Sequence, residues 1–348
     1  MDMKKIMLEL SELSGVSGME YRLSEKVEEL FKPYSDSVEP DVLFNVIATK
    51  KACIPTEETL LLDAHMDEIG MVVTDVTKEG FLKFDNHTGV DRRTILASEV
   101  TVHAEKGDYY GIVTAMPPHL LTPKDVEKTP TFDTLYIDVG YCPEKAKEIF
   151  SPGNFITLKQ TPKALLGQVM TGKTFDDRSS VAAILGLFHA VRDVKLPFNL
   201  VALLSAQEEP GLRCARVVAD RLKPTEAIAI DVTHAFIPDC PRERTVIMGK
   251  GPALTYAPIL DRELTNTIRD VAKEADIPLQ LEVSMGTTGT NSFSIFNTGM
   301  GVKTALISIP LKYMHSVVET LDFSDVKYTS KLLKEYVMYK KEVHEGVR

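Results

Sequence analysis

The sequence predicts an α/β fold that is interrupted by a β-rich segment. Apolar runs of strand length alternate with helix-spaced apolar residues, as expected for a sheet covered by helices. The middle of the chain differs, because short strand-like pieces there are separated by glycine, proline and charged turns. With 348 residues, of which 44% are hydrophobic, the chain can bury a sizeable core in one large domain or two ordinary ones.

The elements of the α/β part follow from apolar spacing. Residues 3–33 predict two short helices, because the helix-spaced apolar residues are divided by the glycines of SGVSG. The same spacing predicts helices at 176–194, 211–222 and 263–275, and a closing helix at 324–345 that begins with a Ser-Asp cap. Apolar runs that fit strands buried on both faces are NVIAT (45–49), TLLLDAH (59–65), NLVALLSA (199–206), EAIAIDV (226–232) and TALISIP (304–310).

The β-rich segment extends from about residue 71 to residue 162. Its strand-like pieces are MVVTDV, GFLKFD, EVTVHA, YYGIVTA and TLYIDVG. We therefore predict that residues 1–70 and 163–348 form one α/β domain and that residues 71–162 form an inserted domain.

Composition excludes several classes of function. The net charge of -10 argues against a nucleic-acid partner, because nucleic-acid-binding proteins usually present a basic face. The N-terminus has no continuous apolar signal region, and no apolar run approaches the roughly 18 residues of a membrane span, so we predict a cytoplasmic protein without a membrane partner. The four cysteines have no pair at the spacing of a zinc knuckle, which favours reduced thiols: Cys53, Cys142, Cys214 and Cys240.

Ionisable residues follow the apolar runs. In open α/β sheets, ligands gather outside the carboxyl ends of the strands, so these residues are expected to converge. They are His65 and Asp67, Glu208 and Glu209, Asp231 and His315, with Asp176 at the start of the helix DDRSSV. Two histidines and several carboxylates suit zinc, cobalt or manganese.

Each of these residues alone has an ordinary explanation, such as a polar strand end or an acidic helix start. Their occurrence at five separate element ends favours a dinuclear metal site. Positions i and i+2 of a strand share a face, so Asp67 can orient the ring of His65. The two oxygens of Asp176 can each bind one ion of a pair about 3.5–4 Å apart. The next basic residue, Arg178, either steadies that carboxylate or faces solvent.

Five motifs in this order resemble the tetrahedral aminopeptidase family of dinuclear metallopeptidases, whose members are also called glutamyl aminopeptidase and cellulase M. The motifs are HMDEIG, FDDR, QEEPGLR, AIDV and MHSVVE, and the resemblance extends over nearly the whole chain. It implies one metal on His65, Asp176 and Asp231 and a second metal on Asp176, Glu209 and His315. It also implies that Glu208 is the general base and that Asp67 is the orienting residue.

The resemblance further implies a mixed-sheet α/β catalytic domain and an inserted small β-barrel domain that makes dimer contacts. Dimers of the family assemble into a hollow tetrahedral dodecamer, so a homo-oligomer is expected. The implied reaction is removal of N-terminal residues from peptides by a hydroxide that two divalent ions activate. The chain departs from the family at Phe44-Asn45, at Cys214-Ala215 and at Asn291, where the family has Asp, and the last change leaves the preferred substrate open.

Two other functions are compatible with parts of this pattern. A glycoside hydrolase would also use paired carboxylates, but it has no use for histidine-bearing metal sites, and the chain has no tryptophan to stack on a sugar. A non-catalytic binding or assembly protein could keep the fold after losing activity. The intact ligand set at every matched position argues against this second alternative.

Overall fold

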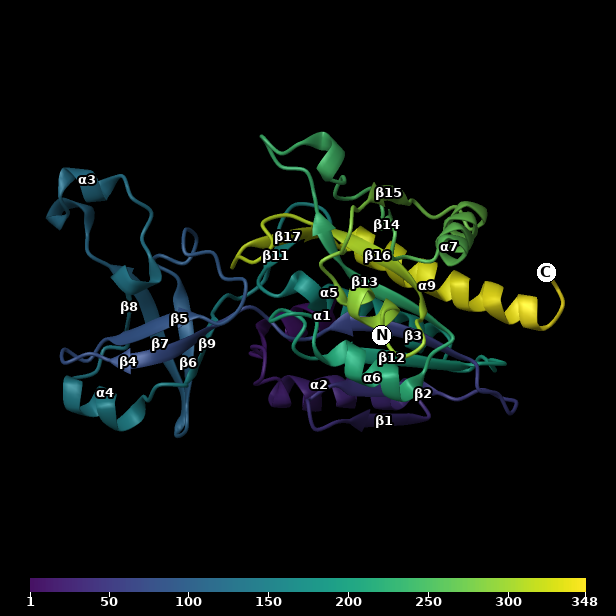
Figure 1. Cartoon of the computed structure of the whole chain (residues 1–348), viewed down its shortest axis with the longest axis horizontal. Coiled ribbons are helices and arrows are strands. Elements are labelled where there is room, and N and C mark those ends of the chain that lie inside the picture. The colour runs from purple at the N-terminus through teal and green to yellow at the C-terminus, as the bar shows by residue number, and fades with distance from the viewer.

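The computed structural model describes the backbone of residues 1–348 and every side chain except that of Asp125. Figure 1 shows a large α/β part on the right and a smaller β-barrel on the left, joined where the chain leaves and re-enters the α/β part. This arrangement confirms the predicted fold class of an α/β protein with a β-barrel insertion.

The α/β part is built on a mixed sheet of eight strands. Its order is β1 (Ser37–Pro40), β2 (Val46–Lys50), β12 (Asn199–Ser205), β3 (Thr59–His65), β13 (Glu226–His234), β16 (Lys303–Leu311), β14 (Ala253–Tyr256) and β15 (Gln280–Val283). The four central strands β12, β3, β13 and β16 run parallel, and all five strands predicted from apolar runs lie in this sheet. Because parallel strands end at one edge, His65, Glu208 and Asp231 are brought to the same side.

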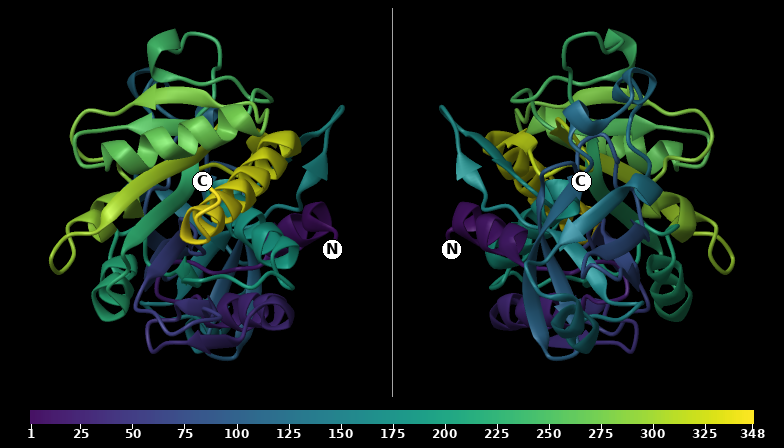
Figure 2. Two further views of the ribbon diagram at one scale, coloured as in Figure 1. Left: turned by 90° about the vertical axis from the view of Figure 1, so that its right-hand side faces the viewer. Right: turned by 90° about the vertical axis from the view of Figure 1, so that its left-hand side faces the viewer.

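Helices cover both faces of the sheet, as the two views of Figure 2 show. One face packs against α1 (Met3–Glu12), α2 (Tyr21–Phe31), α5 (Phe175–Ala190), α7 (Arg262–Glu274) and α9 (Phe323–His344). The opposite face packs against the shorter helices α6 (Cys214–Leu222) and α8 (Asn291–Phe296). The strands between them are almost wholly buried, which explains their continuous apolar sequences.

The barrel closes in the order β4 (Met71–Val76), β5 (Leu82–Asn86), β8 (Leu135–Asp138), β7 (Gly107–Ala115), β6 (Glu99–Ala104) and β9 (Phe155–Leu158). Its antiparallel strands alternate between buried and exposed side chains and enclose a separate apolar core. Two short helices, α3 (Pro123–Val126) and α4 (Pro143–Ile149), lie in the connections. The exact division into domains and a role of the barrel in dimer contacts stay predictions.

A small third sheet connects the two parts near the candidate site. It contains β10 (Lys163–Ala164), β11 (Val169–Gly172) and β17 (Glu319–Asp322). The chain passes from β11 into α5 and from β17 into α9, so this sheet fixes the approach to both helices.

The start of the closing helix differs from the sequence prediction. The closing helix begins at Phe323, and its N-cap is Asp322, whose carboxylate accepts a hydrogen bond of 2.8 Å from the Ser324 amide. The predicted Ser-Asp cap was therefore placed two residues too late, because Ser324 already lies inside the first turn.

Among the described residues, no helix combines the length and apolar character needed to cross a membrane. The cellular location stays a prediction.

Candidate metal centre

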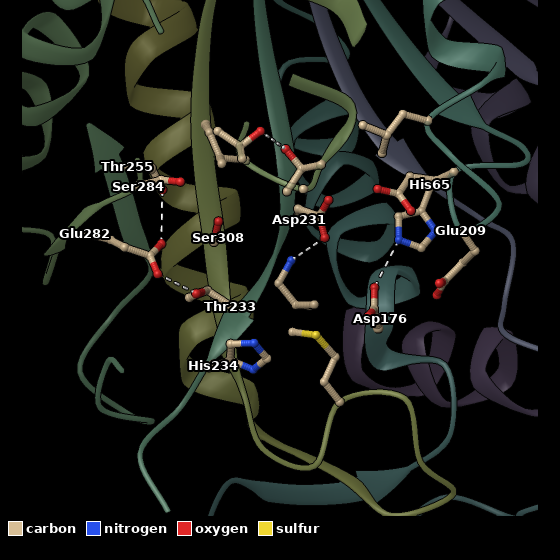
Figure 3. A pocket seen from close by; sticks show the side chains of 18 of the residues that line it. His65, Asp176, Glu209, Asp231, Thr233, His234, Thr255, Glu282, Ser284 and Ser308 are labelled. Carbon is tan, nitrogen blue, oxygen red and sulfur yellow. Dashed lines mark hydrogen bonds and ion pairs between the residues drawn. The ribbon is translucent and has the colours of Figure 1, made fainter. Parts of the chain in front are cut away.

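A cavity of about 530 Å³ opens at the carboxyl edge of the parallel strands. Figure 3 shows His65, Asp176, Glu209 and Asp231 in its wall. Glu208 and His315 also line this cavity, so six of the seven predicted site residues meet there. The seventh, Asp67, is fully buried beneath it.

Asp176 lies between the two predicted histidine ligands. Its Oδ1 is 3.0 Å from Nε2 of His65, and its Oδ2 is 3.3 Å from Nε2 of His315. The same His315 nitrogen is 3.4 Å from Oε2 of Glu209. Each oxygen of Asp176 therefore faces a different histidine, as expected for a carboxylate shared by two ions.

Asp177 belongs to this cluster, and the sequence prediction missed it. The metal-binding atoms of His65, Asp177 and Asp231 lie within 4.8 Å of one another, and so do those of His65, Asp176 and Glu209. Both carboxylate oxygens of Asp177 are buried, and neither has a hydrogen-bond partner of ordinary geometry among the described residues, although the nearby Ser180 hydroxyl favours the ionised form. The Asp-Asp doublet was the available signal, but we assigned only its first residue, Asp176, as a ligand.

The cluster holds more negative charge than its histidines balance. Burial raises the pKa of Asp231 to about 7, and the charge of Asp176 adds to the shift. Burial also raises the pKa values of Glu208 and Glu209 well above their usual range, and neighbouring carboxylates contribute further. Burial opposes ionisation of Asp176 as well, but its contacts with His315 and His65 outweigh this effect and lower its pKa.

This donor set fits divalent cations. Imidazole nitrogens and carboxylate oxygens are ligands of zinc, cobalt and manganese, and bound cations would favour the ionised carboxylates that burial disfavours. The unpartnered oxygens of Asp177 are a second indication, because a buried carboxylate normally has a hydrogen-bond partner or a cation.

Two buried carboxylates hold the backbone that carries the predicted site residues. Asp67 accepts hydrogen bonds from the amides of Glu208 at 3.0 Å and Glu209 at 3.2 Å. Glu319 accepts hydrogen bonds from the amides of Asp176 at 3.2 Å and His315 at 3.1 Å. Sequence reasoning missed Glu319, although it ends the motif MHSVVE.

The geometry of Asp67 differs in detail from the expectation that its carboxylate orients His65. Nδ1 of His65 is hydrogen-bonded at 3.2 Å to the backbone carbonyl of Asp67, whereas the nearer carboxylate oxygen is 3.5 Å away. The carboxylate oxygens accept bonds from Ser17 and from the two glutamate amides instead. Asp67 thus connects His65 to the Glu208–Glu209 turn.

Neither of the two alternatives for Arg178 is correct. Its side chain is buried and donates to backbone carbonyl oxygens, including that of Met66 at 3.0 Å. It also lies 3.3 Å from Glu68, which pairs with Lys173 at 2.6 Å. The arginine therefore joins the first helix, the end of β3 and α5 beside the site.

Asn291 lies behind the pocket and is absent from its described lining. Its Nδ2 donates to Ser205 Oγ at 2.9 Å. Burial raises the pKa of the neighbouring Asp63 to about 7, even though the nearby Ser205 and Asn291 side chains favour its ionised form. An aspartate at position 291 would place a second carboxylate against Asp63. The neutral amide avoids this repulsion, which gives the departure at Asn291 a local structural reason.

Comparison with known proteins gives concordant matches. Residues 45–332 match the M42 glutamyl aminopeptidase family. The chain is 35% identical over 334 residues to a lysyl aminopeptidase of Pyrococcus furiosus, covering 95% of both chains.

Two solved structures show the same similarity. The structure of a TET aminopeptidase from a marine sediment Thaumarchaeota archaeon has a TM-score of 0.91 at 30% identity, covering 96% of this chain and 95% of the other. The structure of a Pyrococcus horikoshii TET1 peptidase, which can assemble into a tetrahedron or a large octahedral shell, has a TM-score of 0.86 at 31% identity, covering 97% and 99%.

Proposed function

The chain belongs to the M42 glutamyl aminopeptidase family, and we propose that it removes N-terminal residues from peptides with the help of two divalent metal ions. The observation that carries this proposal is the contact of both Asp176 oxygens with different histidines at the wall of a large pocket. The similarity to aminopeptidases favours peptide hydrolysis over the glycoside-hydrolase alternative.

We assign the ligands in two sets that share one residue. His65, Asp176 and Asp231 would hold one ion, and Asp176, Glu209 and His315 would hold the other. The contacts of Asp176 with both histidines and of His315 with Glu209 support the assignment, and Asp231 lies close to His65. Asp177 would add a further carboxylate beside His65 and Asp231. The donor set fits zinc, cobalt or manganese.

The proposed chemistry divides between the ions and the protein. Bound divalent ions would polarise the scissile carbonyl and lower the pKa of the attacking water. Glu208 lines the pocket beside Glu209, and we assign it the general base that accepts the water proton and passes it to the leaving amine. Asp67 keeps the two glutamates in place by accepting both of their amide hydrogen bonds.

The remaining proposals concern assembly. By similarity to the TET1 peptidase, we propose that copies of this chain form a homo-oligomer, with a tetrahedral dodecamer as the expected form. The inserted segment 71–162 is the proposed dimer-contact domain. Its closed barrel with a separate core supports this assignment.

A substrate panel tests the function. Purified protein is incubated with aminoacyl-p-nitroanilides and short peptides, with and without added cobalt or zinc. Stepwise release of N-terminal residues that requires metal is expected. Metal-independent hydrolysis of carboxymethylcellulose without any peptide cleavage would contradict the proposal and favour a glycoside hydrolase.

A further inference from the structure

The pocket has a second acidic position, separate from the candidate metal ligands. Figure 3 shows Glu282 on one side and His65 and Glu209 on the other, with Asp231 between them. Glu282 lies on β15, the edge strand of the sheet, and its side chain is partly buried while its neighbours Leu281 and Val283 are exposed. The strand therefore directs this carboxylate into the pocket.

The carboxylate of Glu282 is held in a fixed orientation. Thr233 donates its hydroxyl to Oε1 at 2.7 Å, and Thr255 donates its hydroxyl to Oε2 at 3.1 Å. Both threonines are buried, with exposed fractions of 8% and 1%. Each carboxylate oxygen keeps a further lone pair for another donor, so the group is ordered before a ligand arrives.

The position of Glu282 suits a long side chain. Thr233 follows the predicted ligand Asp231 by two residues on β13, which corresponds to about 6.6 Å along a strand on one face. An extended lysine side chain reaches about 6 Å from its Cα. A residue whose backbone lies at the metal ligands can therefore bring an ammonium or guanidinium group to Glu282.

The surrounding wall favours a cation over an anion. Leu306, Val232 and Met314 offer apolar surface to an alkyl stem, and Ser284 and Ser308 add polar groups. The described lining residues of this pocket include no lysine and no arginine, and apart from the candidate metal ligands His234 is their one basic side chain. A glutamate side chain placed here would face the Glu282 carboxylate and be repelled.

We propose that Glu282 is a specificity-determining residue that selects peptides with an N-terminal lysine or arginine. This inference rests on the proposed aminopeptidase function and makes it more specific. It also separates this chain from a preference for N-terminal glutamate, which the family description names. The binding step is an ion pair with two or more charge-assisted hydrogen bonds in a partly desolvated pocket.

Matched substrates test the proposal. The metal-loaded protein is assayed with the p-nitroanilides of lysine, arginine, norleucine and glutamate, because norleucine retains the alkyl stem of lysine without the ammonium group. We expect kcat/KM for lysine and arginine to exceed that for norleucine by about 10–100-fold, the usual range for a charged hydrogen bond, with glutamate lowest. The dipeptides Lys-Leu and Leu-Lys show whether the selection concerns the first residue.

Two variants and a control locate the effect at Glu282. Glu282→Gln preserves the shape and should lower kcat/KM for lysine by about 10–100-fold while leaving that for norleucine nearly unchanged. Glu282→Lys should reverse the order and favour glutamate. Glu79→Gln removes the charge of an exposed glutamate on a barrel turn and should leave the preference unchanged.

A binding measurement separates this inference from the proposed function. Calorimetry with lysinamide and norleucinamide should show tighter binding of lysinamide to the wild-type protein and equal binding to Glu282→Gln. If the wild-type protein shows equal kcat/KM and equal affinity for the lysine and norleucine compounds, the role of Glu282 is overturned but the aminopeptidase function is not. Selection at the second residue of the peptide would have the same consequence. Absence of turnover with tighter lysinamide binding would overturn the aminopeptidase function and support the cation site.

Discussion

Two neighbouring clusters contain buried carboxylates, and they differ in whether side chains of the protein compensate the negative charge. In the first, Glu68 lies 2.6 Å from Lys173 and 3.3 Å from Arg178, so each of these charged side chains has a partner of opposite sign. In the second, the carboxylates around Asp176 outnumber the histidines, and both oxygens of Asp177 lack a hydrogen-bond partner among the described residues. The balanced cluster joins structural elements, whereas the unbalanced cluster is suited to binding cations.

The pKa shifts follow the same division. Burial lowers the pKa values of Lys173 and Arg178, but their contacts with Glu68 oppose the shift. In the other cluster, burial and neighbouring carboxylates together raise the pKa of Asp231 to about 7. A buried carboxylate that lines a pocket and has no cation to balance its charge is a better indication of function than a buried ion pair.

Metal removal should have the largest effect, and only on the unbalanced cluster. We expect about two divalent ions per chain in the purified protein and complete loss of turnover after EDTA, with recovery on adding zinc or cobalt. At a metal concentration of 100 times its Kd, binding should also stabilise the fold by about 2.7 kcal/mol. Metal analysis, turnover and thermal unfolding of the same sample measure these effects. Full activity after EDTA with at most one retained ion would contradict the dinuclear site.

The next largest effect is expected from Glu208. Glu208→Gln removes basicity but preserves size, so turnover should fall by roughly 10²–10⁴-fold while the metal content stays near two. The matched change Glu209→Gln should weaken one ion, and excess metal should restore part of its activity. Metal analysis that shows the opposite pattern would exchange the two roles.

A smaller effect is expected from the support beneath these glutamates. Asp67 accepts the amides of Glu208 and Glu209 on separate oxygens, and asparagine has only one oxygen acceptor. Asp67→Asn should therefore keep the fold and lower turnover or metal affinity by roughly 10–100-fold. Unchanged kinetics and unchanged metal affinity would mean that these two hydrogen bonds do not position the site.

The sequence predicted the unbalanced cluster far better than the balanced one. Members of the unbalanced cluster follow long apolar runs, so His65 and Asp231 could be located from strand ends alone. The partners of Glu68 come from a turn and a helix start about 105 and 110 residues later, and no local pattern predicts which charges meet across such a separation.

The strands that the sequence analysis did not predict were missed for similar reasons. Long buried strands and amphipathic helices were predicted because their apolar period is clear over many residues. The short strand β14 and the edge strand β15 were not. Two of the four residues of β14 carry hydroxyl groups, every side chain of β15 is polar or exposed, and the neighbouring strand decides their pairing. Glu282 was missed for this reason.

The smallest effect on turnover, but a large effect on stability, is expected from breaking the balanced cluster. Glu68→Gln leaves Lys173 and Arg178 buried without their carboxylate, and loss of one partner of a buried pair typically costs about 3–5 kcal/mol. Turnover per folded molecule and metal content should change little, because Glu68 touches neither histidine in the contacts described. Chemical denaturation with parallel metal analysis measures both.

An exposed glutamate provides a matched control for this last comparison. Glu148 on α4 also contacts two cations, Lys145 at 2.9 Å and Lys106 at 3.2 Å, but more than half of its side chain is exposed. Because water screens that pair of contacts, Glu148→Gln should leave the unfolding free energy nearly unchanged. If Glu68→Gln proves as mild as Glu148→Gln, burial is not what gives the balanced cluster its strength. If Glu68→Gln instead releases metal at unchanged stability, the two clusters form a single functional unit.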